Sequence, residues 1–389
     1  MLALNFNRKT AFGVLFISLF VSMLGLGVIS PLMSIYAESI GATGLWLGAI
    51  FSGFNLSRAF IMPMVGKLSD AWRRRKIFLV IGMVFYGLAS IGYVLSKNAI
   101  HLFFARFLQG FGAGMVLPIS LAYIGDISPK GREGTYTGFI NVARTLGWGC
   151  GPLIGGFLMD LYGFAIPFII MGGLAFASLT LIIFALPESK KSLEHRTNVS
   201  YRKILEVKTI RAVVLYRAIN AIGTGNLFTF FPLLADSIGV APTEVGILLS
   251  SRILVLSLLQ GPCGVLADKF DKTMLILLSG ASSAGLLLLV PLTTSFLEML
   301  IVGLLLGCTW AVLMPATTSL AAEYGRELGM ASVMSTVNLG MSVGMIIGPL
   351  TSGLIMDFLN LHSVFYIGGL IAVFGTSLFY LHVRRNKNS

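Results

Sequence analysis

Apolar residues occur along this chain in long stretches, separated by short segments that carry charges, glycine or proline. A helical stretch of about 20 residues crosses the roughly 30 Å hydrocarbon core of a bilayer. The pattern of apolar stretches and polar breaks therefore predicts membrane-spanning helices. Their expected limits are 11–36, 44–65, 76–96, 99–125, 134–159, 163–186, 209–234, 243–265, 272–293, 296–321, 328–356 and 361–383.

The composition supports a membrane protein and excludes the soluble classes. Of the 389 residues, 56% are hydrophobic and only 11% are charged, whereas soluble domains carry about 25% charged residues. A soluble enzyme and a nucleic-acid-binding protein are excluded, although the net charge is +12. The expected fold class is an all-α membrane protein with twelve transmembrane helices.

The distribution of lysine and arginine predicts the orientation. If both termini are cytoplasmic, Lys97 is the only basic residue in an outer segment, and the densest basic cluster, 73–76, is cytoplasmic. This asymmetry follows the positive-inside rule. The expected location is the plasma (inner) membrane, as a multi-pass protein with both termini in the cytoplasm. The basic residues are expected to face anionic lipid headgroups rather than nucleic acid.

The chain contains an internal repeat at an offset of nearly 200 residues. Asn141 and the segment 147–160 match Asn338 and the segment 344–357, and Asp70 with its preceding glycine motif matches Asp268. The longest polar interruption, 187–208, separates six expected spans from the other six. Repeats of this kind build transporters whose central site opens alternately to either side.

These matches predict two pseudo-symmetric six-helix bundles. The expected limits are an N-terminal bundle at 1–186, a cytoplasmic linker at 187–208 and a C-terminal bundle at 209–389.

A charged motif follows the second expected span. We expect Gly66 to permit a tight turn, and Asp70 to cap or face the positive end of a neighbouring helix. Arg74 and Arg75 then pair with a carboxylate or with lipid phosphate. The motif is either a conformational latch that holds one state of a two-state protein, or only a basic cluster that fixes the orientation in the membrane by the positive-inside rule.

The fifth expected span carries closely spaced small residues and a proline. Glycines four residues apart let two helices approach closely, and an internal proline removes one backbone donor and bends the helix. The span is either a tightly packed pivot, about which the two halves of the protein move, or an ordinary site of close helix packing. The residues concerned are Gly147, Gly151, Pro152, Gly155 and Gly156.

These segments resemble the major facilitator superfamily, and within it the twelve-helix drug:proton antiporter branch. The segment 66–75 is similar to the family's loop 2–3 signature, although Ala71 and Arg73 depart from it. The segment 147–156 is similar to the helix 5 antiporter signature in every fixed position. The resemblance implies export of small molecules in exchange for protons by a monomer.

A further segment, in the fourth expected span, resembles the family's helix 4 signature. It comprises Arg106, Gln109 and Gly110. The resemblance implies a structural or proton-relay role for Arg106.

Five arginines lie inside expected spans, whereas all 16 acidic residues lie at span ends or in loops. A mid-membrane arginine costs about 2.5–3.5 kcal/mol on insertion scales, so each is expected to face the protein interior or a cavity. Arg217 is close enough to the cytoplasmic end to snorkel. Two interpretations are open. In the first, the arginines bind an anionic or strongly hydrogen-bonding substrate. In the second, they donate hydrogen bonds to helix carbonyls and hold the bundle together. The expected substrate-binding residues are Asn55, Arg58, Asn141, Arg144, Arg217, Asn220 and Arg252.

The lack of a mid-membrane acid limits how protons are coupled to transport. Coupling is expected to use an edge carboxylate, Asp126 or Glu38, or else the charge of the substrate itself. Because guanidinium keeps its charge at every relevant pH, neutral or anionic cargo is expected in preference to cationic cargo.

The function expected from the sequence is proton-coupled export of small molecules by alternating access. Alternatives on the same fold are uptake or exchange of an organic anion, and lipid flipping. A membrane-bound sensor would carry a long cytoplasmic extension, and short tails are expected here. A membrane enzyme would need a nucleophile, metal cluster or acid–base pair at one face, and no such group is apparent. No metal or cofactor is expected, and the three cysteines lie in expected spans.

Overall fold

The computed structural model describes residues 8–72, 74–129, 132–189 and 201–387. Within these ranges the secondary structure is helical, without strands. The helices are α1 Arg8–Ile29, α2 Leu32–Ser39, α3 Gly44–Trp72, α4 Lys76–Val94, α5 Ala99–Ile127, α6 Glu133–Tyr162, α7 Ala165–Ala185, α8 Tyr201–Glu206, α9 Lys208–Thr229, α10 Phe231–Ser237, α11 Pro242–Lys269, α12 Lys272–Leu289, the 3-10 helix η1 Val290–Leu292, α13 Phe296–Leu328, α14 Met330–Phe358 and α15 Leu361–Lys387.

Each of the twelve expected spans corresponds to one long helix or to a broken pair. In the described residues, 10 helices are long and apolar enough to cross a membrane, or 11 if the bent pair α9 and α10 forms one span. Helix α6 is not among them, although it has 30 residues. The sequence of α6 is less apolar than that of the other long helices, because it contains Asn141, Arg144 and several glycines.

Two spans that the sequence pattern predicts as continuous are broken in the structure. The expected span 11–36 divides into α1 and α2, and Pro31 stands immediately before α2. The expected span 209–234 bends by 41° between α9 and α10, where Pro232 lies in the first turn of α10. Proline lacks the backbone N–H that a continuing helix needs, and its ring clashes with the preceding turn.

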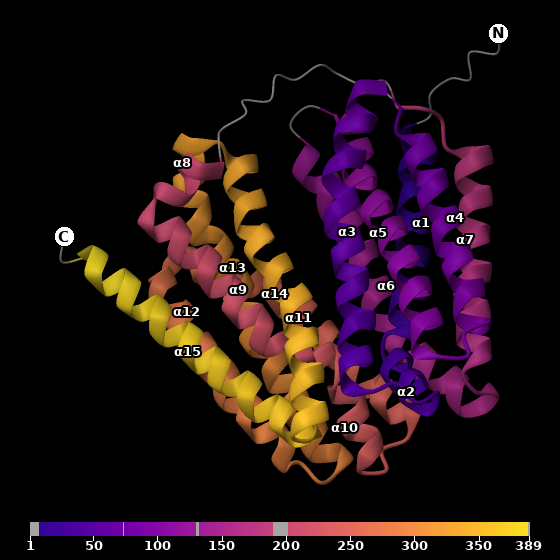
Figure 1. The fold of residues 1–389 in the computed structure, drawn as a ribbon. Coiled ribbons are helices and arrows are strands. Elements are labelled where there is room, and N and C mark those ends of the chain that lie inside the picture. Colours follow the sequence, from indigo (N-terminus) through magenta and orange to yellow (C-terminus); the bar gives the residue numbers. More distant parts are fainter. Residues whose placement is uncertain (1–7, 73, 130–131, 190–200, 388–389) are drawn as a thin grey trace. The chain divides into compact units, whose positions relative to one another are not determined.

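The chain forms two compact units, each with its own cluster of buried apolar side chains. Figure 1 shows the helices of both. Unit 1 comprises residues 1–41 and 53–194, and unit 2 comprises 42–52 and 195–389. The first residues of α3 therefore group with unit 2 and the rest of that helix with unit 1. The expected bundle limits at 186 and 209 stay a prediction.

The packing inside the two units follows the sequence repeat. In unit 1, α1 packs on α6 and α7, and α4 packs on α5 and α7. In unit 2, α9 packs on α14 and α15, and α12 packs on α13 and α15. The corresponding helices thus make corresponding contacts in both units.

The outer surfaces of the helices carry large apolar side chains. Phe184 and Phe358 are 84% and 83% exposed, and Phe60 and Phe104 are also exposed. Apolar surface of this extent is unusual on soluble monomers and typical of membrane contact. Together with the apolar spans, it identifies a multi-pass membrane protein.

Candidate functional site

Arg217, on α9, is fully engaged by neighbouring helices. Its Nε and Nη2 donate to the hydroxyl of Thr317 at 3.0 and 2.7 Å, and Nη2 also donates to Thr318 at 2.7 Å and to the Met314 carbonyl at 3.3 Å. Its Nη1 donates to Asn338 Oδ1 at 3.1 Å. The side chain is 7% exposed, so it joins α9 to α13 and α14 instead of snorkelling to the membrane surface.

Arg252, on α11, has a different environment. Its guanidinium carbon lies 5.0 Å from the ring centroid of Phe228 and 5.7 Å from that of Trp310, distances typical of cation–π contacts. Its Nη1 is buried and has no hydrogen-bond partner among the described residues. A Cβ at Gly307 would lie 2.8 Å from the Arg252 carbonyl oxygen, so α11 and α13 pack closely here.

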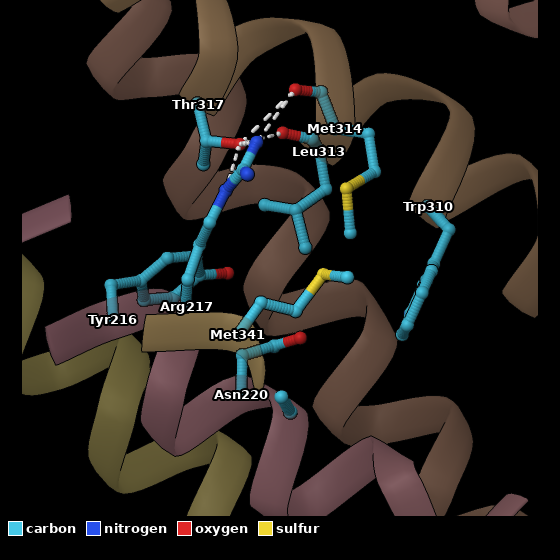
Figure 2. Close-up of a pocket in the computed structure, with 9 residues that line it drawn as sticks. Tyr216, Arg217, Asn220, Trp310, Leu313, Met314, Thr317 and Met341 are labelled. Atoms are coloured by element: carbon cyan, nitrogen blue, oxygen red, sulfur yellow. Dashed lines mark hydrogen bonds between the residues drawn. The ribbon is translucent and has the colours of Figure 1, made fainter. Parts of the chain in front are cut away.

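A small cavity lies beside these residues in unit 2. Its walls include Arg217, Asn220, Trp310 and Met341 (Figure 2). Its volume is about 10 Å³, enough for about one water molecule. The Nδ2 of Asn220 and the Nε1 of Trp310 are buried and lack hydrogen-bond partners in the described part of the chain. Arg252 does not line this cavity, but its guanidinium carbon lies 5.7 Å from the ring centroid of Trp310, so it adjoins one of these two donors.

In unit 1, Arg106 is held by a buried amide. Gln109 Oε1 accepts a hydrogen bond from Arg106 Nη1 and another from the Tyr93 hydroxyl, both at 2.7 Å. The guanidinium also lies over the ring of Phe54, at 4.7 Å from the centroid. These contacts join α5 to α3 and α4. The structural or proton-relay role that the resemblance implies for Arg106 stays a prediction.

Arg58 and Arg144 both belong to unit 1. Arg58 lies near the middle of α3 and is half-buried, and Arg144 on α6 is close enough to interact with it electrostatically. Asn55 and Asn141 lie one turn earlier on the same two helices and are also half-buried. Two like charges in one region favour an anion or strong acceptors nearby.

The motif at residues 66–75 forms a network centred on Arg75. Its Nη1 lies 3.0 Å from Asp70 Oδ1 and donates to Ser69 Oγ at 2.9 Å, and its Nε lies 3.0 Å from Asp126 Oδ2. Ser189 also donates to Asp126, at 2.9 Å. This network joins the ends of α3 and α5 to the segment after α7. Arg74 is exposed, so its expected pairing with a carboxylate or with lipid phosphate stays a prediction.

A second carboxylate caps helix α4. Glu188 Oε1 accepts from the backbone N–H groups of Arg75 at 2.5 Å and Lys76 at 3.1 Å. The acidic side chain therefore meets the positive end of α4, as such groups favour. The sequence analysis did not select Glu188 or Ser189, because both follow the last apolar residues of their span and belong to no motif.

The tight turn expected at Gly66 is absent. Helix α3 continues through this residue to Trp72, and a Cβ at Gly66 would meet no atom within 4 Å. The apolar window ends near Gly66, but the helix itself continues into the polar residues beyond it.

The glycines of α6 lie against the backbone of α1. A Cβ at Gly147 would overlap the Phe20 carbonyl, and one at Gly155 would overlap the Val28 carbonyl. Gly151 lies against Gly27 in the same way. Pro152 lies inside α6 and Gly156 is buried there, so this motif forms the α1–α6 contact of unit 1.

Two other predicted positions have clear environments. A Cβ at Gly110 would overlap Ser57 Oγ and the Phe54 carbonyl, so this glycine lets α5 approach α3. Glu38 is exposed near the end of α2. Of the two candidate coupling carboxylates, only Asp126 belongs to the Arg75 network.

Several site residues escaped the sequence analysis. Trp310, Phe228 and Thr317 lie within apolar spans, where their type gives no signal of a polar contact. Asn338 carried a usable signal, because the repeat aligns it with Asn141.

Comparison with known proteins places the chain in a family. The sequence profile of the Major Facilitator Superfamily matches residues 15–216 and again 213–389. An uncharacterised MFS-type transporter of Methanocaldococcus jannaschii is 30% identical over 379 residues, covering 96% of this chain and 98% of that protein.

Two further relatives are named for drug resistance. Multidrug resistance protein 2 of Bacillus subtilis is 26% identical over 96% of this chain and 95% of its own. Quinolone resistance protein NorA of Staphylococcus aureus is 25% identical over 88% of this chain and 89% of its own.

Solved structures share the fold. A bacterial homologue of the human lysosomal transporter Spinster superposes with a TM-score of 0.82 at 14% identity, covering 97% of both chains. The nucleoside transporter NupG superposes with a TM-score of 0.81 at 14% identity, covering 97% of this chain and all of its own. With the twofold profile match and the repeated helix packing, these likenesses give the conclusion that this chain is a transporter of the Major Facilitator Superfamily.

Proposed function

We propose that this transporter exports small drug-like molecules by proton-coupled alternating access, and that its cargo is neutral or anionic. The relatives named for multidrug and quinolone resistance support export of this kind. We further propose that both termini face the cytoplasm, as the distribution of basic residues indicates, and that the protein acts as a monomer.

One observation carries the proposal about cargo. Among the residues that the structure describes, the buried Nη1 of Arg252 has no acceptor, and two aromatic rings lie over its guanidinium. In the described spans, acidic side chains lie towards helix ends, and none lies near the middle with the arginines. A buried charge needs a partner, so a carbonyl or carboxylate of the cargo is the natural acceptor. A lipophilic cation offers no such group.

The remaining contacts divide the proposed site by function. Two residues of unit 2, Arg252 and Asn220, are assigned to cargo binding. So are Arg58, Asn55, Arg144 and Asn141 of unit 1. Arg217 is assigned a supporting role, because its donors are engaged by protein oxygens.

The test is transport in proteoliposomes under an imposed pH gradient. Three probes of similar size are compared: an aromatic carboxylate, its neutral amide and a quaternary ammonium analogue. We expect movement of the carboxylate or amide to depend on the gradient and on Arg252, and to fall at least tenfold in Arg252→Gln. Transport of the ammonium probe alone would refute the assignment of Arg252.

The same assay separates the alternatives. Exchange of the carboxylate that needs neither a pH gradient nor a membrane potential would favour an organic-anion exchanger. Movement of a fluorescent phospholipid without movement of the small probes would favour a flippase.

A further inference from the structure

The cavity of unit 2 lies beside a buried charge that no carboxylate balances. The hydrogen-bond acceptors of Arg217 are two threonine hydroxyls, one backbone carbonyl and one side-chain amide, all of them neutral. Among the residues that the structure describes, no aspartate or glutamate forms an ion pair with it. Neutral acceptors satisfy the N–H groups of Arg217, but they leave its positive charge without a counterion in a medium of low dielectric constant.

Two further polar groups at the cavity are hydrogen-bond donors. The Nδ2 of Asn220 and the Nε1 of Trp310 are buried, and neither has an acceptor in the part of the chain that the structure describes. These side chains come from α9 and α13, and both line the cavity together with Arg217 (Figure 2). Because a buried donor without an acceptor is costly, the cavity favours an occupant that accepts hydrogen bonds.

The size of the cavity limits what this acceptor can be. Its volume of about 10 Å³ holds roughly one particle of the size of water, so the carboxylate of a drug-sized molecule does not fit. The side chains of Met314 and Met341 form part of the wall, and methionine adapts readily to the shape of a neighbour. The cavity can therefore accommodate a monatomic ion slightly larger than water.

The charge of the surroundings favours an anion over a water molecule. A water molecule would accept from the two donors, but it would leave the charge of Arg217 unbalanced. A second guanidinium adjoins the site, because the guanidinium carbon of Arg252 lies 5.7 Å from the ring centroid of Trp310. Two positive charges in one region of low dielectric constant attract an anion strongly.

We propose that this cavity binds one halide ion, chloride under physiological conditions, as a fixed counterion for Arg217. The ion accepts hydrogen bonds from Asn220 Nδ2 and Trp310 Nε1, and it supplies the negative charge that is missing near the middle of the described spans. The site is built by α9, α13 and α14 of one unit, so it needs no movement between the two units. The proposal goes beyond the function proposed above, because the ion is not the cargo and binds in its absence. It gives Asn220, assigned above to cargo, a second ligand.

The first experiment detects contact between the ion and Trp310. Bromide is the probe, because it quenches indole fluorescence on contact and has the charge and nearly the size of chloride. The chain has four tryptophans, and one variant keeps only Trp310 after Trp46, Trp72 and Trp148 are replaced by phenylalanine. In detergent, with sodium gluconate holding the ionic strength constant, we expect its quenching to saturate with bromide and to be relieved by chloride. The variant that keeps only Trp148, in unit 1, is the matched control and should show a linear decrease.

The second experiment measures the stability of the whole protein in the two salts. Replacing gluconate by chloride should raise the melting temperature of the parent by several degrees, because a ligand that binds only the folded state stabilises it. Trp310→Phe keeps the ring beside Arg252 but removes the N–H, so the chloride concentration that gives half of this effect should rise at least tenfold.

Asn220→Asp tests the charge of the occupant. It places a carboxylate at the cavity, which takes the place of the ion as counterion of Arg217. We expect this variant to melt as high in gluconate as the parent melts in chloride, and chloride should add nothing further.

Linear bromide quenching in both single-tryptophan variants, with equal melting temperatures of the parent in chloride and gluconate, would overturn the proposal. A chloride effect that is unchanged in Trp310→Phe and in Asn220→Asp would overturn this location of the ion. Neither experiment uses cargo or a pH gradient. A failed transport assay therefore leaves the halide site standing, and a missing halide site leaves proton-coupled export intact.

Discussion

At the scale of single residues, two similarly buried arginines of unit 2 differ in their partners. Arg217 and Arg252 are 7% and 5% exposed. The first has hydroxyl, amide and carbonyl acceptors on two helices, whereas the second lies between aromatic rings with an unsatisfied Nη1. The first stabilises the unit, and we assign the second to cargo.

This difference predicts opposite phenotypes. Arg217→Met should lower the unfolding free energy by about 1–3 kcal/mol, because it removes several hydrogen bonds, while cargo affinity changes little. Thr317 and Thr318 still donate to the carbonyls of Leu313 and Met314, which limits the loss. Arg252→Gln should abolish binding of the carboxylate probe with little change in stability, because losing its cation–π contacts is offset by removing a buried charge.

Thermal unfolding and equilibrium binding, measured on the same detergent preparations, check both variants. Loss of binding in Arg217→Met at an unchanged melting temperature would move the ligand site to Arg217.

At the scale of helices, the glycine pattern was the most informative feature of the sequence. The spacing of Gly147, Gly151 and Gly155 predicted a close helix contact, and the structure confirms one with α1. Contacts of this kind replace side-chain packing by direct backbone approach. The assignment of a pivot to this contact stays a prediction.

The α1–α6 contact predicts a sharp difference between two glycines of one helix. Gly151→Leu places a side chain where Gly27 lies, so we expect loss of the folded protein or a melting temperature at least 10 °C lower. Gly138→Ala, earlier in α6, meets no atom within 4 Å, and alanine is the better helix former by about 1 kcal/mol. Its melting temperature should stay the same or rise. Similar losses in both variants would show that α6 is sensitive along its whole length.

The sequence predicted the helices better than their ends and their partners. The apolar windows located every long helix, because membrane spans depend on local composition. They missed the break before Pro31 and the continuation of α3 past Gly66, because an apolar window does not register where the backbone hydrogen bonds end. Proline positions could have indicated the first of these.

The candidate site was predictable only in part, for a related reason. The arginines stand out because charge is rare in spans. Their partners do not, since Trp310 and Thr317 are ordinary residues for a membrane helix. They lie beside Arg252 and Arg217 because α13 packs against α11 and α9. The cap at Glu188 likewise depends on a contact with the amino-terminal end of α4, 112 residues away in the sequence.

At the scale of the whole molecule, cations lie inside the spans and carboxylates lie towards their ends. An exporter with a mid-membrane carboxylate can exchange a cation for a proton at one group. That arrangement is not found in the described spans, so we propose that an anionic cargo contributes its own charge to the energetics of transport. The proposed preference for neutral or anionic cargo therefore has an electrical consequence.

Export of a monoanion in exchange for one inward proton moves two charges in the direction that the membrane potential favours. A neutral cargo moves one charge, and a monovalent cation moves none. Each charge is worth about 2.3 kcal/mol per 100 mV, so an anion gains about 4.6 kcal/mol at that potential.

We therefore expect a potassium diffusion potential, negative on the cytoplasmic face, to drive export of the carboxylate probe without any pH gradient. Proteoliposomes with valinomycin test this, with the neutral amide as the matched comparison. The amide should respond about half as strongly in free-energy terms. If the rate of carboxylate transport does not change with the membrane potential, proton antiport of an anion is excluded and electroneutral anion exchange is supported.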